Sequence, residues 1–148
     1  MTINLDANHG YESKKICVKY FEENNISDAI VSQIEVGDTI DERLDEVFKK
    51  HNDITAIYVS GSKGFLAAKY LEEKKLKNIS LCCFDLLEYN IKYLNKNSID
   101  FIISQRSVEQ CQRGVETLFN YIAKQQSPEK DYLMPIEIII KENLEYYR

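Results

Sequence analysis

Residues 99–106 read Ile99-Asp100-Phe101-Ile102-Ile103-Ser104-Gln105-Arg106 and are the strongest indicator of the fold in this sequence. This stretch begins as an apolar run with β-branched side chains, ends in three polar residues, and is followed at once by a long helical pattern. A buried strand that leads through a polar tip into a helix is typical of an open α/β sheet. In such sheets, side chains just beyond the carboxyl ends of parallel strands line the ligand-binding crevice. Gln105 and Arg106 are therefore candidate binding residues.

The rest of the chain alternates between sequence patterns typical of strands and of helices. Strands are expected at residues 29–36, 55–60, 79–84 and 136–140, and helices at 10–23, 40–50, 65–71, 86–95 and 107–125, with a helical turn or frayed tail at 142–147. Strands alternating with helices at this spacing predict right-handed βαβ crossovers. The expected fold class is α/β in three layers, with a mostly parallel sheet and helices on both faces.

The length and the net charge of the chain limit the range of possible functions. A chain of 148 residues forms about one domain and can bury a core without disulfides. The net charge is −5, and lysines are interspersed with acidic residues instead of clustered. A long phosphate-binding footprint, as in nucleic-acid binding, is therefore not expected.

The cysteines indicate a reducing compartment. Cys17, Cys82, Cys83 and Cys111 form no Cys-x-x-Cys pair, and Cys82 and Cys83 should point to opposite faces of one strand. The first ten residues lack a basic segment and an apolar core, and no apolar run approaches membrane length. We expect free thiols and a cytoplasmic protein that does not contact a membrane.

Polar side chains follow three of the expected strands. Ser60 and Ser62 come after the first, Asp85 after the second, and Gln105 and Arg106 after the third. If the sheet is parallel, these tips meet at one edge, and their donors and acceptors suit a ligand with many hydroxyls. The alternative is that they are ordinary polar loop residues after buried strands.

Enzyme functions have less support. The loop Ser60–Gly64 lacks P-loop spacing, and Asp85 lacks the neighbouring acidic pair that a Mg²⁺-dependent phosphoacceptor needs. His9 and His51 lie away from a plausible nucleophile. We expect no enzyme, no cofactor and no metal site, with a flavodoxin-like enzyme or phosphoacceptor as an alternative.

Several blocks together resemble a known family. They are Asn8-His9-Gly10-Tyr11, Ile57-Tyr58-Val59-Ser60-Gly61-Ser62, Cys83-Phe84-Asp85, the stretch from Ile99 to Arg106, Glu109-Gln110-Cys111-Gln112-Arg113-Gly114 and Met134-Pro135-Ile136-Glu137. Their order resembles the carboxyl-terminal half of the effector-binding region of lac-repressor-type transcription regulators, which is similar to type I periplasmic sugar-binding proteins. The resemblance covers nearly the whole chain.

The resemblance implies a domain organisation and a ligand. Residues 1–104 would form the carboxyl-terminal lobe, 105–128 a hinge and a helix belonging to an absent first lobe, and 129–148 a return strand and tail. A small molecule, usually a sugar, would bind between the lobes, with Asp85 accepting hydrogen bonds from its hydroxyls and Gln105 at the hinge. Full-length relatives bind DNA through a separate domain, so no direct DNA contact is expected from this chain.

Three positions depart from the pattern of that family. Ala7 stands where an arginine is usual, Gly61 where an asparagine or aspartate is usual, and Cys111 where a glycine is usual. Loss of charge-assisted hydrogen bonds, each worth about 1.5 to 3 kcal/mol, would weaken ligand binding. A second hypothesis is therefore a degenerate lobe that only associates, as a homodimer or domain-swapped oligomer, through the apolar face from Val108 to Ile122.

Overall fold

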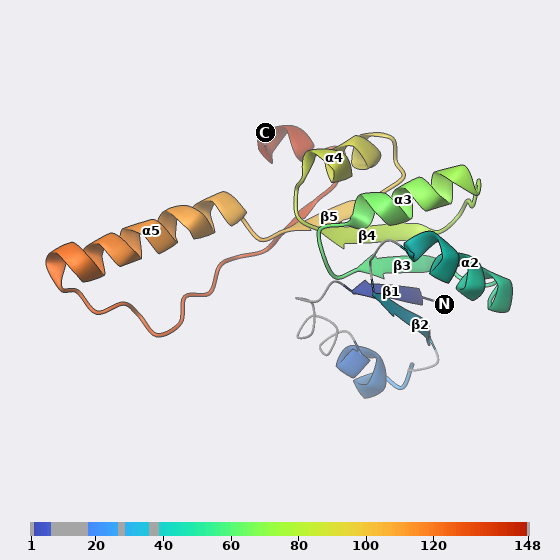
Figure 1. The fold of residues 1–148 in the computed structure, drawn as a ribbon, viewed down its shortest axis with the longest axis horizontal. Helices are drawn as coiled ribbons and strands as arrows, with labels where there is room; N and C mark the ends of the chain where they lie inside the picture. Colours follow the sequence, from blue (N-terminus) through green and yellow to red (C-terminus); the bar gives the residue numbers. More distant parts are fainter. Residues whose placement is uncertain (1, 7–17, 27–28, 36–38, 148) are drawn as a thin grey trace.

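The computed structural model describes residues 2–6, 18–26, 29–35 and 39–147. In this part of the chain, one sheet contains six strands in the order β2-β1-β3-β4-β5-β6 (Figure 1). The strands are β1 (Thr2–Asp6), β2 (Ile30–Glu35), β3 (Ala56–Val59), β4 (Ser80–Phe84), β5 (Phe101–Ser104) and β6 (Glu137–Ile139). All neighbours pair in parallel except β5 and β6, which are antiparallel. The predicted mostly parallel α/β sheet is confirmed.

Strand β1 is the element that the sequence did not predict. It lies between β2 and β3 and pairs with both, so it is an interior strand. The other expected strands are confirmed to within two residues at either end, apart from Val36, which lies outside the described residues. Of the expected helix at 10–23, residues 18–23 are helical. Residues 10–17 and the block around His9 lie outside the described residues.

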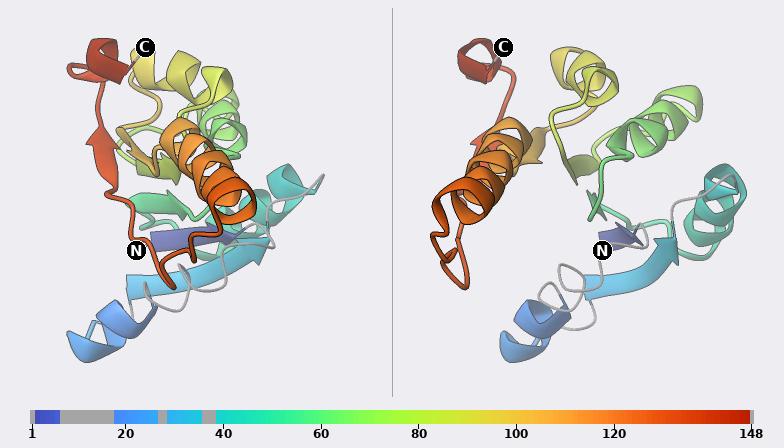
Figure 2. Two further views of the ribbon diagram at one scale, coloured as in Figure 1. Left: turned by 90° about the vertical axis from the view of Figure 1, so that its left-hand side faces the viewer. Right: turned by 60° about the vertical axis from the view of Figure 1, so that its left-hand side comes forward.

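Three helices cover one face of the sheet. They are α2 (Ile40–Lys50), α3 (Gly64–Glu73) and α4 (Glu88–Asn95), and residues 18–23 lie on the opposite side (Figure 2). Alternate strand residues point toward these helices, and Ile57, Val59, Leu81, Cys83 and Ile102 are each at most 1% exposed. Burial of these apolar side chains with Leu44 of α2 and Leu94 of α4 forms the core.

Helix α3 approaches β4 very closely. A Cβ atom added at Gly64 would lie 2.4 Å from both Cβ and Sγ of Cys83. Only glycine at the first position of α3 therefore allows this packing. Cys83 is buried and Cys82 is partly exposed, as expected for neighbours on one strand. Cys82, Cys83 and Cys111 are free thiols, while Cys17 lies outside the described residues.

The remaining helix, α5 (Ser107–Lys124), projects away from the sheet together with the segment that leads back to β6 (Figure 1). We call residues 107–136 the arm, and residues 2–104 with 137–147, as far as described, the lobe. No residue of α5 is buried. Its apolar side chains Val108, Val115, Leu118, Phe119 and Ile122 are 58–71% exposed. The chain ends in a short 3-10 helix, η2 (Leu144–Tyr147), of which Leu144 packs in the core.

Candidate ligand-binding site

The loops that follow β3 and β4 and the end of β5 lie side by side at one edge of the sheet. The backbone N–H of Phe84 donates to the carbonyl of Gly61 at 3.3 Å, and that of Asp85 donates to Ile103 at 3.0 Å. Asp85 therefore lies between the Gly61 loop and β5. The parallel sheet brings the predicted tip residues to a common edge.

Asp85 has an unusual backbone conformation at this edge. Its φ of 67° lies in the left-handed region, which Asp tolerates better than most residues. The side chain is half-buried, and burial raises the pKa of its carboxyl above the ordinary value. No hydrogen bond joins this carboxylate to another residue that the structure describes. With respect to the described residues, its oxygens can therefore act as acceptors for the hydroxyl groups of a ligand.

The two serines of the β3 loop differ in access. Ser60 is 8% exposed and interacts with neighbouring groups, whereas Ser62 is partly exposed. The Ser62 carbonyl accepts a hydrogen bond from Asn90 at 2.8 Å, so the loop backbone is fixed. Of this pair, Ser62 is better placed to donate to, or accept from, a molecule beside Asp85.

Asn90 organises the edge, and sequence reasoning missed it. This α4 residue is fully buried, and its Nδ2 donates to the carbonyls of Ser62, Phe84 and Asp85 at 2.8, 3.2 and 3.0 Å. Its Oδ1 accepts from the backbone N–H of Phe65 at 2.9 Å. One side chain thus connects the loops after β3 and β4 with the start of α3. The available signal was a polar residue one turn before Leu94 on the buried face of α4.

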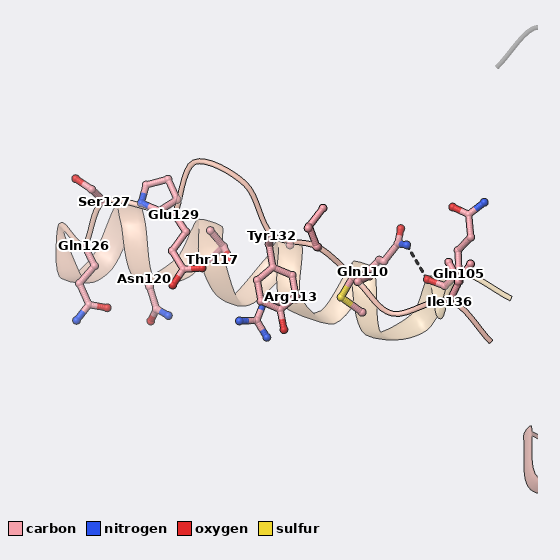
Figure 3. A pocket seen from close by; sticks show the side chains of 14 residues that line it. Gln105, Gln110, Arg113, Thr117, Asn120, Gln126, Ser127, Glu129, Tyr132 and Ile136 are labelled. Carbon is pink, nitrogen blue, oxygen red and sulfur yellow. Dashed lines mark hydrogen bonds between the residues drawn. The ribbon is translucent and has the colours of Figure 1, made fainter. Parts of the chain in front are cut away.

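The third strand tip contains Gln105, which is exposed. Its backbone carbonyl accepts a hydrogen bond from Nε2 of Gln110 at 2.6 Å. This contact fixes the backbone between β5 and the arm, and the Gln105 side chain stands clear of α5 (Figure 3).

Arg106 is engaged in ion pairs. Its Nη1 lies 3.1 Å from Oε2 of Glu109, and its Nη2 pairs with Glu137 at the start of β6. These carboxylates raise the pKa of the guanidinium above its ordinary value. Its Nε is buried and has no hydrogen-bond partner in the part of the chain described here. Two carboxylates thus engage Nη1 and Nη2 of the guanidinium, and the ligand-binding role of Arg106 stays a prediction.

A separate hollow of about 680 Å³ lies between α5 and the return segment (Figure 3). Gln105 lines its near end, and Tyr132 lies in its middle, where the Arg113 guanidinium carbon is 3.3 Å from the ring centroid. Ser60, Ser62, Asp85 and Arg106 do not line it. Apart from Gln105, the lining residues of the hollow belong to the arm.

The described residues also bear on other chemistries. They contain no group of three or more His, Cys, Asp or Glu side chains that could hold a metal ion. None of their helices is long and apolar enough to cross a membrane. The strand tips provide a carboxylate, hydroxyls and an amide, which suit hydrogen bonding to a neutral polar ligand.

Solved structures share this fold. The chain has a TM-score of 0.85 and 24% identity with a protein assigned as a LacI transcriptional regulator from Bacteroides fragilis, covering 99% of this chain and 55% of that one. For a periplasmic ribose ABC transporter protein from Conexibacter woesei the TM-score is 0.81 and the identity 18%, with 99% of this chain and 52% of that one covered. For GanP, a glucose-galactose binding protein from Geobacillus stearothermophilus, the TM-score is 0.74 and the identity 20%, with 97% of this chain and 54% of that one covered. The chain thus spans about half the length of these proteins.

Sequence comparison identifies the family. No curated protein matches the chain significantly. The model of the periplasmic binding protein domain, however, matches residues 4–126, from β1 through the end of α5. The match includes every candidate binding residue, and the architecture agrees with the resemblance drawn from the sequence. The chain therefore belongs to the periplasmic binding protein domain family.

Proposed function

We propose that this chain is the carboxyl-terminal lobe of a sugar-binding region and that the sugar contacts the strand tips. Asp85 would accept hydrogen bonds from sugar hydroxyls, and Ser62 and Gln105 would complete the polar edge, with Ser60 supporting the loop. The ligand class is supported by structural neighbours described as a periplasmic ribose ABC transporter, a glucose-galactose binding protein and an arabinose binding protein.

The observation that carries this proposal is the state of the Asp85 carboxylate. Burial of a carboxylate costs free energy unless hydrogen bonds compensate for the lost water. Asp85 is half-buried with a raised pKa, and described residues donate no hydrogen bond to its oxygens. A ligand hydroxyl would supply the missing donors, so binding would recover part of this cost.

A thermal-shift assay with a panel of monosaccharides tests the proposal. At least one sugar is expected to raise the unfolding temperature of the chain, because a ligand that binds only the folded state stabilises it by mass action. The Asp85→Ala variant should lose the shift, and the matched variant Asp131→Ala, which removes an exposed carboxylate from the arm, should keep it. A shift that survives Asp85→Ala, or no shift with any sugar, would reject the proposal.

We further propose that the arm packs against a first lobe, which would make residues 105–128 part of that lobe and residues 129–148 the return to this one. The exposed apolar side of α5 supports this packing. So does the length of the similar structures, of which the chain covers about half. The complete protein would be a cytoplasmic transcription regulator with the sugar as effector, for which the neighbour from Bacteroides fragilis is the support.

Association between copies is the second candidate function. An exposed apolar helix face of this kind also suits pairing with another copy or exchange of arms. Light scattering at increasing concentration separates the two proposals. A first lobe added in trans that keeps the chain in a one-to-one complex supports packing between lobes. Dimers that persist with that lobe present support association.

A further inference from the structure

The direction of α5 relative to the lobe is not fixed by packing. No residue of α5 is buried, and the helix joins the lobe through two segments, one leaving β5 and one entering β6. These segments run side by side at the base of the arm (Figure 1). Contacts between them therefore decide where the arm points.

Arg106 makes such a contact. The β5–β6 ladder ends at the pair Ser104 and Glu137, and Arg106 lies two residues beyond that end. Its guanidinium reaches across to the Glu137 carboxylate, so an ion pair continues the connection after the backbone hydrogen bonds stop. The backbone of Arg106 is in the left-handed region at φ 53°, which a non-glycine residue adopts only at a conformational cost.

This ion pair differs from the others in the described protein. The side chains of Arg106 and Glu137 are 33% and 19% exposed, whereas both partners of the four lysine pairs are 37–64% exposed. Solvent and salt screen a partly buried pair less than an exposed one. The second partner, Glu109, is 54% exposed and belongs to the same helix start as Arg106, so that pair does not span the two segments.

We propose that Arg106 is a positioning residue. Its ion pair with Glu137, which we call the latch, links the segment that leaves β5 to the start of β6 and so sets the direction of the arm. The place of Arg106 next to Gln105 means that the latch also fixes the backbone of that residue at the strand-tip edge. The meaning of the arm as a link to a first lobe rests on the proposed function. The latch itself is a property of this chain without any ligand.

Distances between spin labels test the latch directly. One label is placed on α3 through Lys69→Cys and one near the far end of α5 through Ala123→Cys, with Cys17, Cys82 and Cys111 replaced by serine and buried Cys83 retained. Double electron–electron resonance then gives the distance distribution across the hinge. Glu137→Gln removes the cross-segment pair, and Glu109→Gln is the matched control that removes only the local pair.

The latch predicts that the distance between the two labels has a narrow distribution in the parent protein. The width of this distribution should at least double in Glu137→Gln and stay the same in Glu109→Gln. The charge-exchanged variant Arg106→Glu with Glu137→Arg should narrow the distribution again. Circular dichroism checks that the lobe unfolds at the same temperature, and Arg106→Gln, which removes the guanidinium, replaces Glu137→Gln if that variant does not fold. An equally narrow Glu137→Gln distribution, a parent as broad as the variant, or equal broadening by Glu109→Gln would overturn the latch. None of these outcomes depends on sugar binding.

Discussion

The lobe and the arm contain helices of opposite kinds. Helix α4 has only eight residues, yet its Asn90 and Leu94 are completely or almost completely buried. Helix α5 has eighteen residues and buries none. Helix α4 is stabilised by packing against the core of the lobe. Helix α5 is also amphipathic, but its apolar face has no packing partner among the described residues. An apolar helix face therefore predicts that a contact exists, but not that the contact lies within the same chain.

The largest expected difference comes from one substitution made in both regions. Leu94→Ala, in the core at 1% exposure, should lower the free energy of unfolding by about 2–5 kcal/mol through lost burial and a cavity. Leu118→Ala on α5, where the leucine is 58% exposed, should change it by less than about 0.5 kcal/mol. Urea unfolding followed by circular dichroism measures both. Equal losses would show that α5 is packed in solution.

Buried and exposed asparagines provide the next comparison. Asn90→Ala leaves three carbonyls and one N–H at the strand tips without their partner, which should cost about 2–3 kcal/mol. Asn120→Ala on α5 removes a partly exposed side chain and should be nearly neutral. Chemical unfolding of both variants is the measurement. A neutral Asn90→Ala would mean that water replaces this side chain at no cost.

Two glycines give changes of opposite sign. Gly64→Ala places a methyl group against Cys83 and should destabilise the lobe by about 1–3 kcal/mol. Gly114→Ala on α5 meets nothing within 4 Å and should increase arm helicity, since alanine favours a helix over glycine by about 0.8–1 kcal/mol. Thermal unfolding reports the first effect and helical circular dichroism the second. A stabilising Gly64→Ala would contradict the close contact between α3 and β4.

The smallest expected effect is electrostatic. Burial raises the pKa of Asp85 above 3.8, so the folded state binds this proton more tightly than the unfolded chain. The stabilisation that protonation brings is present in acid and is lost as pH rises through the raised pKa. At neutral pH, Asp85→Asn should therefore stabilise the sugar-free protein slightly, because the partial exposure of this residue limits the effect.

That gain should disappear as the pH falls below 3.8, where Asp85 is protonated in both states. Asn suits the left-handed backbone as well as Asp does, so the comparison isolates the charge. Asp131→Asn in the arm is the matched control and should show no such pH dependence. Unfolding temperatures across the acidic range give the answer, and a destabilised Asp85→Asn at neutral pH would mean that the carboxylate is already compensated.

Most of the fold was predictable because periodicity reports burial. Strands β3, β4 and β5 alternate or run apolar in the sequence, and their buried residues follow that pattern. Strand β1 was missed because only Ile3 and Leu5 of its residues are apolar. Its position between two parallel strands, which makes it a strand, is a property of the sheet and not of its own sequence.

The candidate site was predictable in part. The convergence of Gly61, Asp85 and β5 follows from parallel strands, whose carboxyl ends share an edge. The role of Asn90 could not be deduced, because its four hydrogen bonds join backbone groups from loops far apart in the sequence. The strand-tip position of Arg106 is visible in the sequence, and its ligand-binding role stays a prediction. Its partner Glu137 becomes a neighbour only through the antiparallel return of β6.

We propose that the strand-tip edge binds a monosaccharide, and amide NMR spectra of the isotope-labelled chain can detect this binding residue by residue. Titration with D-ribose, D-galactose or D-arabinose to about 100 mM detects even millimolar affinities. At least one sugar is expected to move the amide signals of Ser62, Asp85 and Gln105, and Asp85→Ala should abolish these shifts. Shifts confined to the hollow beside α5, around Thr117 and Tyr132, or no shifts with any sugar would contradict it.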